Sequence, residues 1–344
     1  MDNGLTAKVQ VLSGDIGGTK TRLAVFTVDG LTLEALAEEE YPSQQYASLS
    51  TIIETFLKQH DVVIDVAGFG IAGPVRNNSV DATNLPWHIS ANSIAERFNI
   101  KQVALINDLE ANAWGIRSLQ DNDFYQLNTG NPVRSGNAAI IAAGTGLGEA
   151  GLYFDGEDYC PFATEGGHTD FSPSSELEVK LLGFLLERYK HASWERVLSG
   201  PGLVTLHEFL CNYRKKEIPA DLQDAMRSAD AAAAISQAAL KGHDEISLEA
   251  LELFVHLYGV EAGNLALKIM ATGGLYIGGG IAPKILDVLK DGTFMTAFSA
   301  KGRMQSLLEN MPVRVILNDR TALYGSAVYA ILKHNPSVVW RHHN

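Results

Sequence analysis

The stretch GDIGGTKTRLAVF at residues 14–26 decides the fold class, and AAGTGLGEAGLYF at residues 142–154 has the same form. Each passes from a strand through small residues that include a threonine, then resumes a strand pattern that ends in phenylalanine. A P-loop or dinucleotide-binding turn would continue into a helix, and neither stretch contains G-K-[ST]. Both predict β-hairpins with glycine-rich turns, a pattern that a duplicated domain would produce.

Glycine turns of this kind can bind phosphate, because backbone N–H groups approach an anion closely where no Cβ intervenes. A third glycine cluster, at residues 278–280, follows a predicted strand at 274–277. Asp15 is placed to hold a hydrated Mg²⁺ beside a phosphate in the first turn. The alternative is that the turns are only tight hairpins. The predicted nucleotide-binding residues are Gly14, Asp15, Ile16, Gly17, Gly18, Thr19, Gly144, Thr145, Gly146, Gly279 and Gly280.

The rest of the chain alternates strand and helix patterns, which indicates an α/β fold. Apolar residues at helical spacing predict helices at 48–60, 90–98, 109–117, 176–191, 228–241, 247–270 and 321–333. Buried-strand patterns lie at 61–73, 102–106 and 312–317. At 344 residues, the chain has the length of two domains.

Composition excludes several classes of protein. Apolar residues make up 46% of the chain and charged residues 19%, which is ordinary globular usage. The net charge of −13 argues against nucleic acid as the main partner. No apolar run reaches transmembrane length, and the first eight residues lack the pattern of a signal peptide. Two cysteines outside any C-x-x-C pair favour a reducing compartment, so we expect a cytosolic protein without a membrane partner.

Asn107 and Asp108 follow the buried-strand pattern at 102–106, at the strand end where open α/β sheets place their ligands. A carboxylate there could act as a general base. Asp108 could equally cap the helix predicted at 109–117. The residues alone leave both interpretations open.

Glu165 and His168 flank two glycines in a loop rich in serine and threonine. Carboxylates and imidazoles that hydrogen bond in pairs suit a ligand that offers only hydroxyl groups, as a sugar does. The same pair could ligate zinc, although no second His/Cys cluster lies nearby.

Seven stretches carry a resemblance that covers residues 14 to about 325: GDIGGTKTRLAVF, TNLPW, INDLEANAWG, AAGTGLGEAGL, EGGHTDFSP, ERVLSGPGLV and GGLYIGGGIAPK. In this order they resemble the bacterial-type ATP-dependent glucokinase family, within the actin/hexokinase-like sugar kinases. The cysteine cluster of the related ROK sugar kinases is absent from the sequence.

The resemblance implies a two-lobe actin/hexokinase-like (ribonuclease H-like) fold with its active site in an interlobe cleft that closes on the sugar. Residues 1–118 with 321–344 would form the small domain and 119–320 the large one. The enzyme would transfer a phosphoryl group from Mg-ATP to the 6-hydroxyl of glucose, the first step of glycolysis, and would form a homodimer. Asp108 would be the catalytic base, and the other sugar contacts would be Asn84, Asn107, Glu165, His168 and Glu195.

Two rival interpretations remain at this stage. One is a kinase for a different hexose. The other is a sugar-sensing regulator without catalysis, which would carry an additional DNA-binding segment, whereas 13 residues precede Gly14.

Overall fold

The computed structural model describes residues 9–29, 32–228 and 230–335. The chain divides into two compact units. The first consists of Met1–Asp123, Cys160–Ala163 and Asn318–Asn344, and the second of Phe124–Tyr159 and Thr164–Leu317. The predicted boundaries after residues 118 and 320 lie a few residues from two of these limits. The prediction also placed residues 1–8 and 336–344 in the small domain, and these lie outside the described residues.

The first unit is built on a five-stranded sheet of order β3-β2-β1-β4-β7. The elements are β1 (Val9–Ile16), β2 (Lys20–Asp29), β3 (Thr32–Pro42), η1 (Ser43–Gln45), α1 (Leu49–Gln59), β4 (Val66–Ile71), β5 (Ser79–Asp81), β6 (His88–Ser90), α2 (Ala91–Phe98), β7 (Gln102–Asn107), α3 (Asp108–Gly115), η2 (Ile116–Ser118), η3 (Asp121–Asp123) and α12 (Thr321–His334). Strands β1, β4 and β7 are parallel, and β2 is antiparallel to both of its neighbours.

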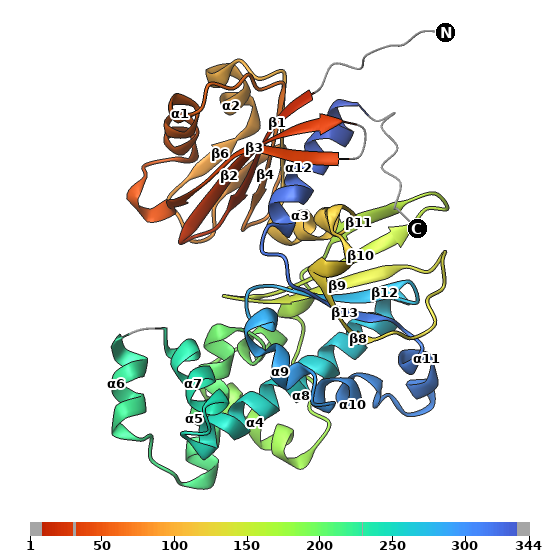
Figure 1. Cartoon of the computed structure of the whole chain (residues 1–344). Helices are drawn as coiled ribbons and strands as arrows, with labels where there is room; N and C mark the ends of the chain where they lie inside the picture. The colour runs from red at the N-terminus through yellow and green to blue at the C-terminus, as the bar shows by residue number, and fades with distance from the viewer. Residues whose placement is uncertain (1–8, 30–31, 229, 336–344) are drawn as a thin grey trace. The chain divides into compact units, whose positions relative to one another are not determined.

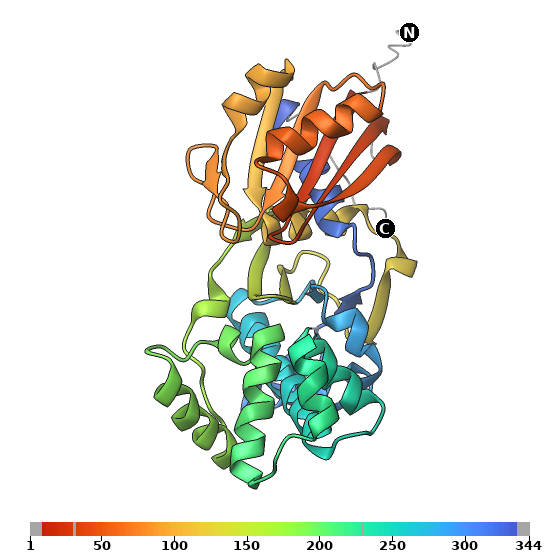
Figure 2. The same cartoon turned by 90° about the vertical axis from the view of Figure 1, so that its left-hand side faces the viewer.

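Helices cover both faces of this sheet (Figures 1 and 2). On one face, α1 buries Leu49, Ile52, Ile53 and Phe56, the i, i+3, i+4, i+7 spacing of an amphipathic helix. The Ser48 side chain caps this helix by accepting a hydrogen bond from the Thr51 N–H. A fully buried side chain such as Phe56 contributes about 1.5–3 kcal/mol relative to exposure.

On the other face, α12 lies against β4 and α3 at glycine contacts. A methyl group at Gly325 would overlap the Ala111 carbonyl, and one at Gly115 would overlap the Thr321 carbonyl. Gly68 of β4 is packed in the same way against Ser326. The C-terminal helix is therefore part of the same core as the first strands.

A six-stranded sheet has the order β11-β10-β9-β12-β13-β8, and it belongs to the second unit except for residues 160–163 of β11, which are assigned to the first. The elements are β8 (Phe124–Asn128), β9 (Ala138–Ala143), β10 (Leu147–Phe154), β11 (Tyr159–Ala163), η4 (Gly166–His168), α4 (Glu176–Arg188), η5 (Trp194–Arg196), α5 (Gly200–Arg214), α6 (Ala220–Ser228), α7 (Ala231–Leu240), α8 (Glu245–Ile269), β12 (Gly274–Gly278), η6 (Ala282–Ile285), α9 (Leu286–Leu289), α10 (Thr293–Ser299), η7 (Gly302–Met304), α11 (Gln305–Glu309) and β13 (Val313–Ile316). Strands β9, β12 and β13 are parallel, and β10 is antiparallel to β9.

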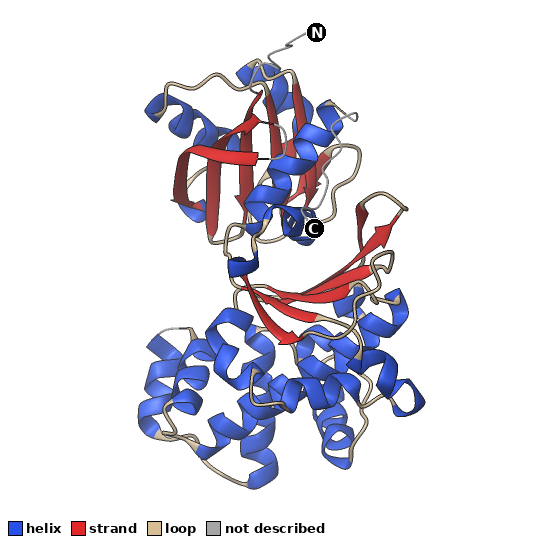
Figure 3. Cartoon of the chain, turned by 45° about the vertical axis from the view of Figure 1, so that its right-hand side comes forward, coloured by secondary structure: helices blue, strands red, loops and turns tan. Residues whose placement is uncertain are grey.

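The core of this unit lies between the sheet and a layer of helices (Figure 3). Helix α8 is the centre of the layer: it packs on β9, α5, α7 and α10, and most of its 25 residues are buried. Such a helix is apolar around most of its circumference because other elements surround it. Within the described ranges, no helix combines the length and the apolar character that a membrane crossing needs.

Both glycine stretches form the predicted hairpins. Strand β1 pairs with β2 up to Ile16 and Thr21, and β9 pairs with β10 up to Ala143 and Leu147. The two sheets also share an order, since β11-β10-β9-β12-β13 matches β3-β2-β1-β4-β7 in chain sequence. The repeated pattern in the sequence thus corresponds to a repeated sheet.

Candidate active site

Three parallel strands of the first unit end side by side. Ile16 of β1 pairs with Ile71 of β4, and Ile71 pairs with Asn107 of β7. Asp15 therefore lies at the same carboxyl edge of the sheet as Asp108, the first residue of α3. This edge is where open α/β sheets bind ligands.

Asn107, rather than Asp108, is the N-cap of α3. Its Oδ1 accepts hydrogen bonds from the N–H groups of Leu109 (2.9 Å) and Glu110 (3.4 Å), and its Nδ2 donates to the Gly73 carbonyl. Asp108 Oδ1 also accepts from the Leu109 N–H at 2.9 Å. The helix predicted at 109–117 begins one residue earlier and ends at Gly115. Asp108 thus contributes one capping hydrogen bond, and Asn107 is the principal N-cap of α3.

The two aspartates interact electrostatically. Asp15 is half-buried, and burial together with the Asp108 carboxylate raises the pKa of Asp15 to about 6. The Arg22 guanidinium opposes this shift, and it also forms an ion pair with Asp319 at 3.1 Å. Two carboxylates this close repel each other, so the edge is suited to a cation or to a shared proton.

The glycine turn of the first hairpin is tightly held. The Gly17 N–H donates to the Lys20 carbonyl at 2.9 Å, and Ser43 Oγ donates to the Gly17 carbonyl at 2.8 Å. Asn84 lies against the turn, since a methyl group at Gly18 would come within 2.6 Å of the Asn84 Cβ. The Asn84 side chain is exposed. The structure thus brings Asn84 to the first glycine turn.

In the second unit the other two glycine turns converge. Gly278 pairs with Ala142, and the Ile281 N–H donates to the Ala143 carbonyl. Gly279 has φ +82°, and a methyl group there would overlap the Ala143 carbonyl. This position requires a residue without Cβ, whereas nothing lies within 4 Å of a methyl group built at Gly144 or Gly280.

A cavity of about 1200 Å³ opens beside these turns. Gly144, Thr145 and Gly280 line it together with the first turn of α5, and α7 and α8 supply apolar side chains. Helix α5 begins at Gly200, with Ser199 as its N-cap, and the Gly200 N–H donates to the Gly144 carbonyl at 2.8 Å. Polar backbone at one end and apolar walls at the other suit a nucleotide, whose phosphates bind glycine turns and helix N-termini.

Sequence reasoning missed part of this cavity. Lys284 and the first turn of α5 line it, as does the start of α7. The signal for α5 was available, because Ser199 before Gly-Pro-Gly is an N-cap followed by proline in the first turn. The contribution of α7 depends on tertiary packing and has no local signal.

The predicted sugar residues of the second unit form one group. The His168 Nε2 lies 3.9 Å from Glu165 Oε2, and the His168 Nδ1 lies 4.0 Å from Glu195 Oε1. Glu165 and His168 are exposed, and Glu195 is half-buried. Glu195 Oε2 also accepts the Leu147 N–H at 3.0 Å, which joins this group to the second glycine turn. The imidazole and the two carboxylates together offer enough hydrogen-bond acceptors to bind several hydroxyl groups at once.

The structure thus gathers the predicted residues into two sets, one in each unit. The first contains the residues 14–19 turn, Asn84, Asn107 and Asp108, and the second contains the other two turns, Glu165, His168 and Glu195. Among residues 9–29, 32–228 and 230–335, no group of three or more His, Cys, Asp or Glu side chains could hold a metal ion.

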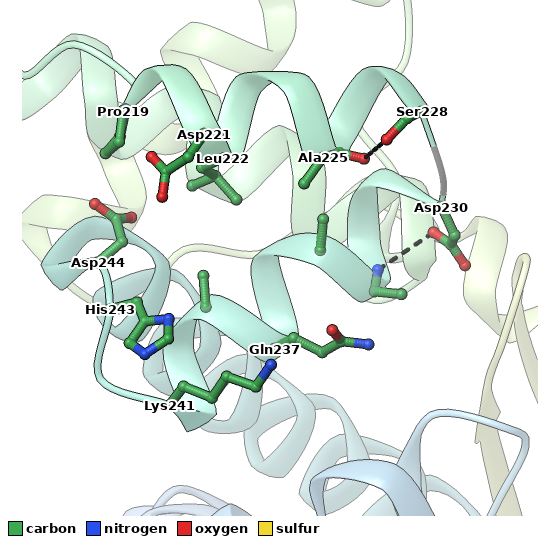
Figure 4. A pocket seen from close by; sticks show the side chains of 13 residues that line it. Pro219, Asp221, Leu222, Ala225, Ser228, Asp230, Gln237, Lys241, His243 and Asp244 are labelled. Atoms are coloured by element: carbon green, nitrogen blue, oxygen red, sulfur yellow. Dashed lines mark hydrogen bonds between the residues drawn. The ribbon is translucent and has the colours of Figure 1, made fainter.

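A smaller cavity, of about 270 Å³, contains none of these residues (Figure 4). It lies between α6 and α7, and Asp221, Lys241 and His243 line it. Asp230 at its rim caps α7 by accepting from the Ala232 N–H.

The repeated sheet, its glycine hairpins and the acidic edge define a class, the two-lobe sugar kinases of actin/hexokinase-like fold. The glucokinase family model matches residues 12–333. The chain belongs to the glucokinase family, and it phosphorylates glucose as an ATP-dependent sugar kinase.

The chain is similar to known glucokinases over nearly its whole length. A glucokinase of Nostoc punctiforme is 41% identical, over 93% of this chain and 98% of its own length. The crystal structure of a glucokinase from an Antarctic psychrotroph is 31% identical with a TM-score of 0.82, over 94% of this chain and 98% of that one. A ROK family glucokinase from Streptomyces griseus, in complex with glucose and AMPPNP, shares the fold at 21% identity and a TM-score of 0.62, over 94% of this chain and 99% of that one.

Proposed function

We propose that the protein transfers the γ-phosphoryl group of ATP to the 6-hydroxyl of glucose, with Asp108 as the general base. The position of Asp108 carries the proposal: it lies at the carboxyl edge of β1, β4 and β7, beside Asp15, while Asn107 supplies the main helix cap. The Asp108 carboxylate accepts the hydroxyl proton as the oxygen attacks phosphorus. The bond to the leaving oxygen breaks, and ADP departs with its electron pair.

Glucose would be held by Glu165, His168 and Glu195, with Asn84 and Asn107 as further contacts. The 3.9 Å and 4.0 Å separations from His168 to the two glutamates support a shared ligand, because hydroxyl groups can bridge such distances. Carboxylates accept hydroxyl protons and orient the sugar. Positioning of this kind supplies more of the rate than the base does, about 7–11 kcal/mol for a well-oriented pair.

ATP would bind in the cavity of the second unit. The cavity is lined by Gly144, Thr145 and Gly280, and Gly146 and Gly279 belong to the same two turns. The N-terminus of α5, which is the positive end of the helix dipole, would lie near the phosphates. The hairpin at residues 14–19 would donate backbone N–H groups to the transferring phosphate. The apolar side chains of α7 and α8 that line the cavity would contact the adenine base of ATP.

Magnesium fits the acidic edge of the first unit. Burial and the Asp108 carboxylate raise the pKa of Asp15 to about 6, and a hydrated cation would favour its charged form. Asp15 would hold Mg²⁺ through water. The bound ion would neutralise charge on the phosphates of ATP.

Two further predictions belong to this proposal. The enzyme would work in the cytoplasm, which its two free cysteines, Cys160 and Cys211, favour. A homodimer is the state that the family resemblance implies.

A hexose panel tests the proposal, with ADP release as the readout and ATP, ADP and polyphosphate as alternative donors. We expect glucose with ATP to give the highest kcat/KM, and 6-deoxyglucose to inhibit competitively without releasing ADP. A higher kcat/KM for another hexose would identify a different hexose kinase. Glucose binding without turnover of any sugar would identify a sensor.

A further inference from the structure

Two buried carboxyl groups meet beneath the loop that carries Glu165 and His168. Glu149 of β10 is 2% exposed, and Glu261 of α8 is 0% exposed. The two carboxyl groups interact electrostatically, and each disfavours a negative charge on the other. A bond between two carboxyl groups requires a proton on one of them, because a carboxylate has no donor. Glu149 Oε1 has no hydrogen-bond partner among the described residues, and a proton shared with Glu261 would supply one.

Glu149 is in direct contact with the turn η4. A methyl group at Gly166 would overlap the Glu149 carboxyl group, and the three nearest atoms to it all belong to Glu149. Thr164 fastens the turn to the same residue: its Oγ1 donates to the Glu149 carbonyl at 2.8 Å and accepts the Gly166 N–H at 3.2 Å. The turn therefore rests on Glu149 through side chain and backbone.

The same turn fixes the two proposed sugar ligands. The His168 N–H donates to the Glu165 carbonyl at 3.0 Å, and the Thr169 N–H donates to the Gly166 carbonyl at 3.0 Å. A methyl group at Gly167 would overlap the Leu147 carbonyl, so the turn lies flat on β10. A displacement of Gly166 must move Glu165 and His168 with it.

We propose that Glu149 is a positioning residue for glucose binding: its buried carboxyl group supports Gly166 and so sets the positions of Glu165 and His168. The inference rests on the proposed role of these two residues as sugar ligands. It assigns a function to a buried acid that does not line the nucleotide cavity.

The surrounding charges place the proton on Glu149. Glu261 accepts hydrogen bonds from Asn264 Nδ2 at 2.8 Å and from Lys268 Nζ at 3.4 Å, so it is the better site for the negative charge. Lys301 donates to Asn264 Oδ1 at 2.7 Å and adds a second positive charge on that side. The other titratable neighbour on α8 is Tyr258, whose pKa is raised by burial and by Glu149.

Alkaline pH should therefore disturb the turn. Burial and the charge of Glu261 raise the pKa of Glu149 far above that of an exposed glutamate. Below the raised pKa the pair shares a proton. Above it, two buried anions face each other with no donor between them, and the resulting repulsion acts on Gly166.

The decisive measurement is the KM for glucose and the KM for ATP of wild-type enzyme and of Glu149→Gln, from about pH 6 to about pH 9. Glutamine keeps a donor toward Glu261 and cannot ionise. In wild type we expect the glucose KM to rise by at least about fivefold at the alkaline end, the lower bound for an unpaired buried group. In Glu149→Gln that rise should be absent, while the pH profile of the ATP KM stays the same in both.

Glu178→Gln is the matched control. Glu178 is also a buried glutamate of the second unit, but its carboxyl group hydrogen bonds to Ser174 and His256. This variant should keep the wild-type alkaline rise in glucose KM. An identical rise in wild type and Glu149→Gln, or no rise in wild type, would overturn the inference.

A pair of size changes tests the contact at constant pH. Gly166→Ala should raise the glucose KM, because its methyl group displaces the Glu149 carboxyl. Adding Glu149→Ala removes the overlap, so the double variant should have a lower glucose KM than Gly166→Ala alone. A double variant no better than Gly166→Ala would contradict the inference, even if Glu149→Gln failed to fold.

Failure of the sugar site itself has a different signature. Glu165→Gln and His168→Gln report on the ligands directly, through glucose binding measured by calorimetry. If both bind glucose as tightly as wild type, the proposed sugar site is wrong and the inference fails with it. If both bind weakly and Glu149→Gln keeps the alkaline rise, only the inference fails.

Discussion

Glu195 illustrates how one residue connects two parts of the site. Its Oε2 accepts the Leu147 N–H at 3.0 Å and lies 2.5 Å from where a methyl group at Gly146 would be. Its Oε1 faces His168. A substitution at Gly146 therefore disturbs a proposed sugar ligand as well as the glycine turn, and it does not report on nucleotide binding alone.

At the scale of single residues, we predict that Glu165→Ala and Glu195→Ala each weaken glucose binding by about 1–3 kcal/mol, the cost of leaving partner groups unpaired. Glu195→Ala should have the larger effect, because it also removes the acceptor of the Leu147 N–H. Isothermal calorimetry measures both affinities. Glu252→Ala, at an exposed position of α8, is the control and should bind glucose normally. Wild-type affinity in both test variants would remove these residues from the site.

Sequence reasoning named candidate residues for the site but left the role of one of them open. It left Asp108 between a base and a helix cap, because both roles suit an aspartate at a strand–helix junction. The evidence on the capping role comes from the Asn107 side chain, which accepts hydrogen bonds from two backbone N–H groups of α3. Glu149 and Glu261 were not singled out, since their proximity joins a strand to a helix more than 100 residues away.

At the scale of elements, the glycine hairpins were predictable because the strand pattern resumes directly after each turn. Strand β3 was not: its sequence TLEALAEEEYP is rich in good helix formers and carries three consecutive glutamates. Pairing with β2 along its whole length overrides that propensity. The order of the strands within each sheet likewise depends on contacts between distant segments.

The turn after β12 gives a prediction with its own control. Gly280→Val adds a side chain where nothing lies within 4 Å, at the rim of the nucleotide cavity. We expect it to fold normally and to raise the KM for ATP by about tenfold or more, the cost of a lost hydrogen bond to a charged group. The KM for glucose should change little.

Gly279→Ala next to it should behave in the opposite way. Its φ of +82° and the overlap with the Ala143 carbonyl make any Cβ unfavourable, so we expect a loss of about 1–3 kcal/mol in unfolding free energy. Melting curves and steady-state kinetics separate the two outcomes. Equal effects of Gly280→Val on both substrates would argue against ATP binding at this turn.

At the scale of the whole molecule, the chain leaves the first unit after Asp123, contributes Cys160–Ala163 to it again, and returns to it at Asn318. Helix α12 completes the core of the first unit through Gly325 and Ala111. The length of the chain predicted two domains. Only the family resemblance indicated that the C-terminal helix belongs with the N-terminal strands. Such a connection leaves no local signal, because the segments that pack together are about 200 residues apart or more.

The central claim is that Asp108 removes the proton from the glucose hydroxyl that attacks phosphorus. Asp108→Asn tests it directly, because asparagine keeps the shape and the hydrogen bond to the Leu109 N–H, and Asn107 still caps α3. The measurement is kcat on a sample whose melting curve and glucose affinity match wild type. We predict that kcat falls by at least about 10²-fold. A folded, glucose-binding Asp108→Asn enzyme with kcat close to that of wild type would contradict the claim.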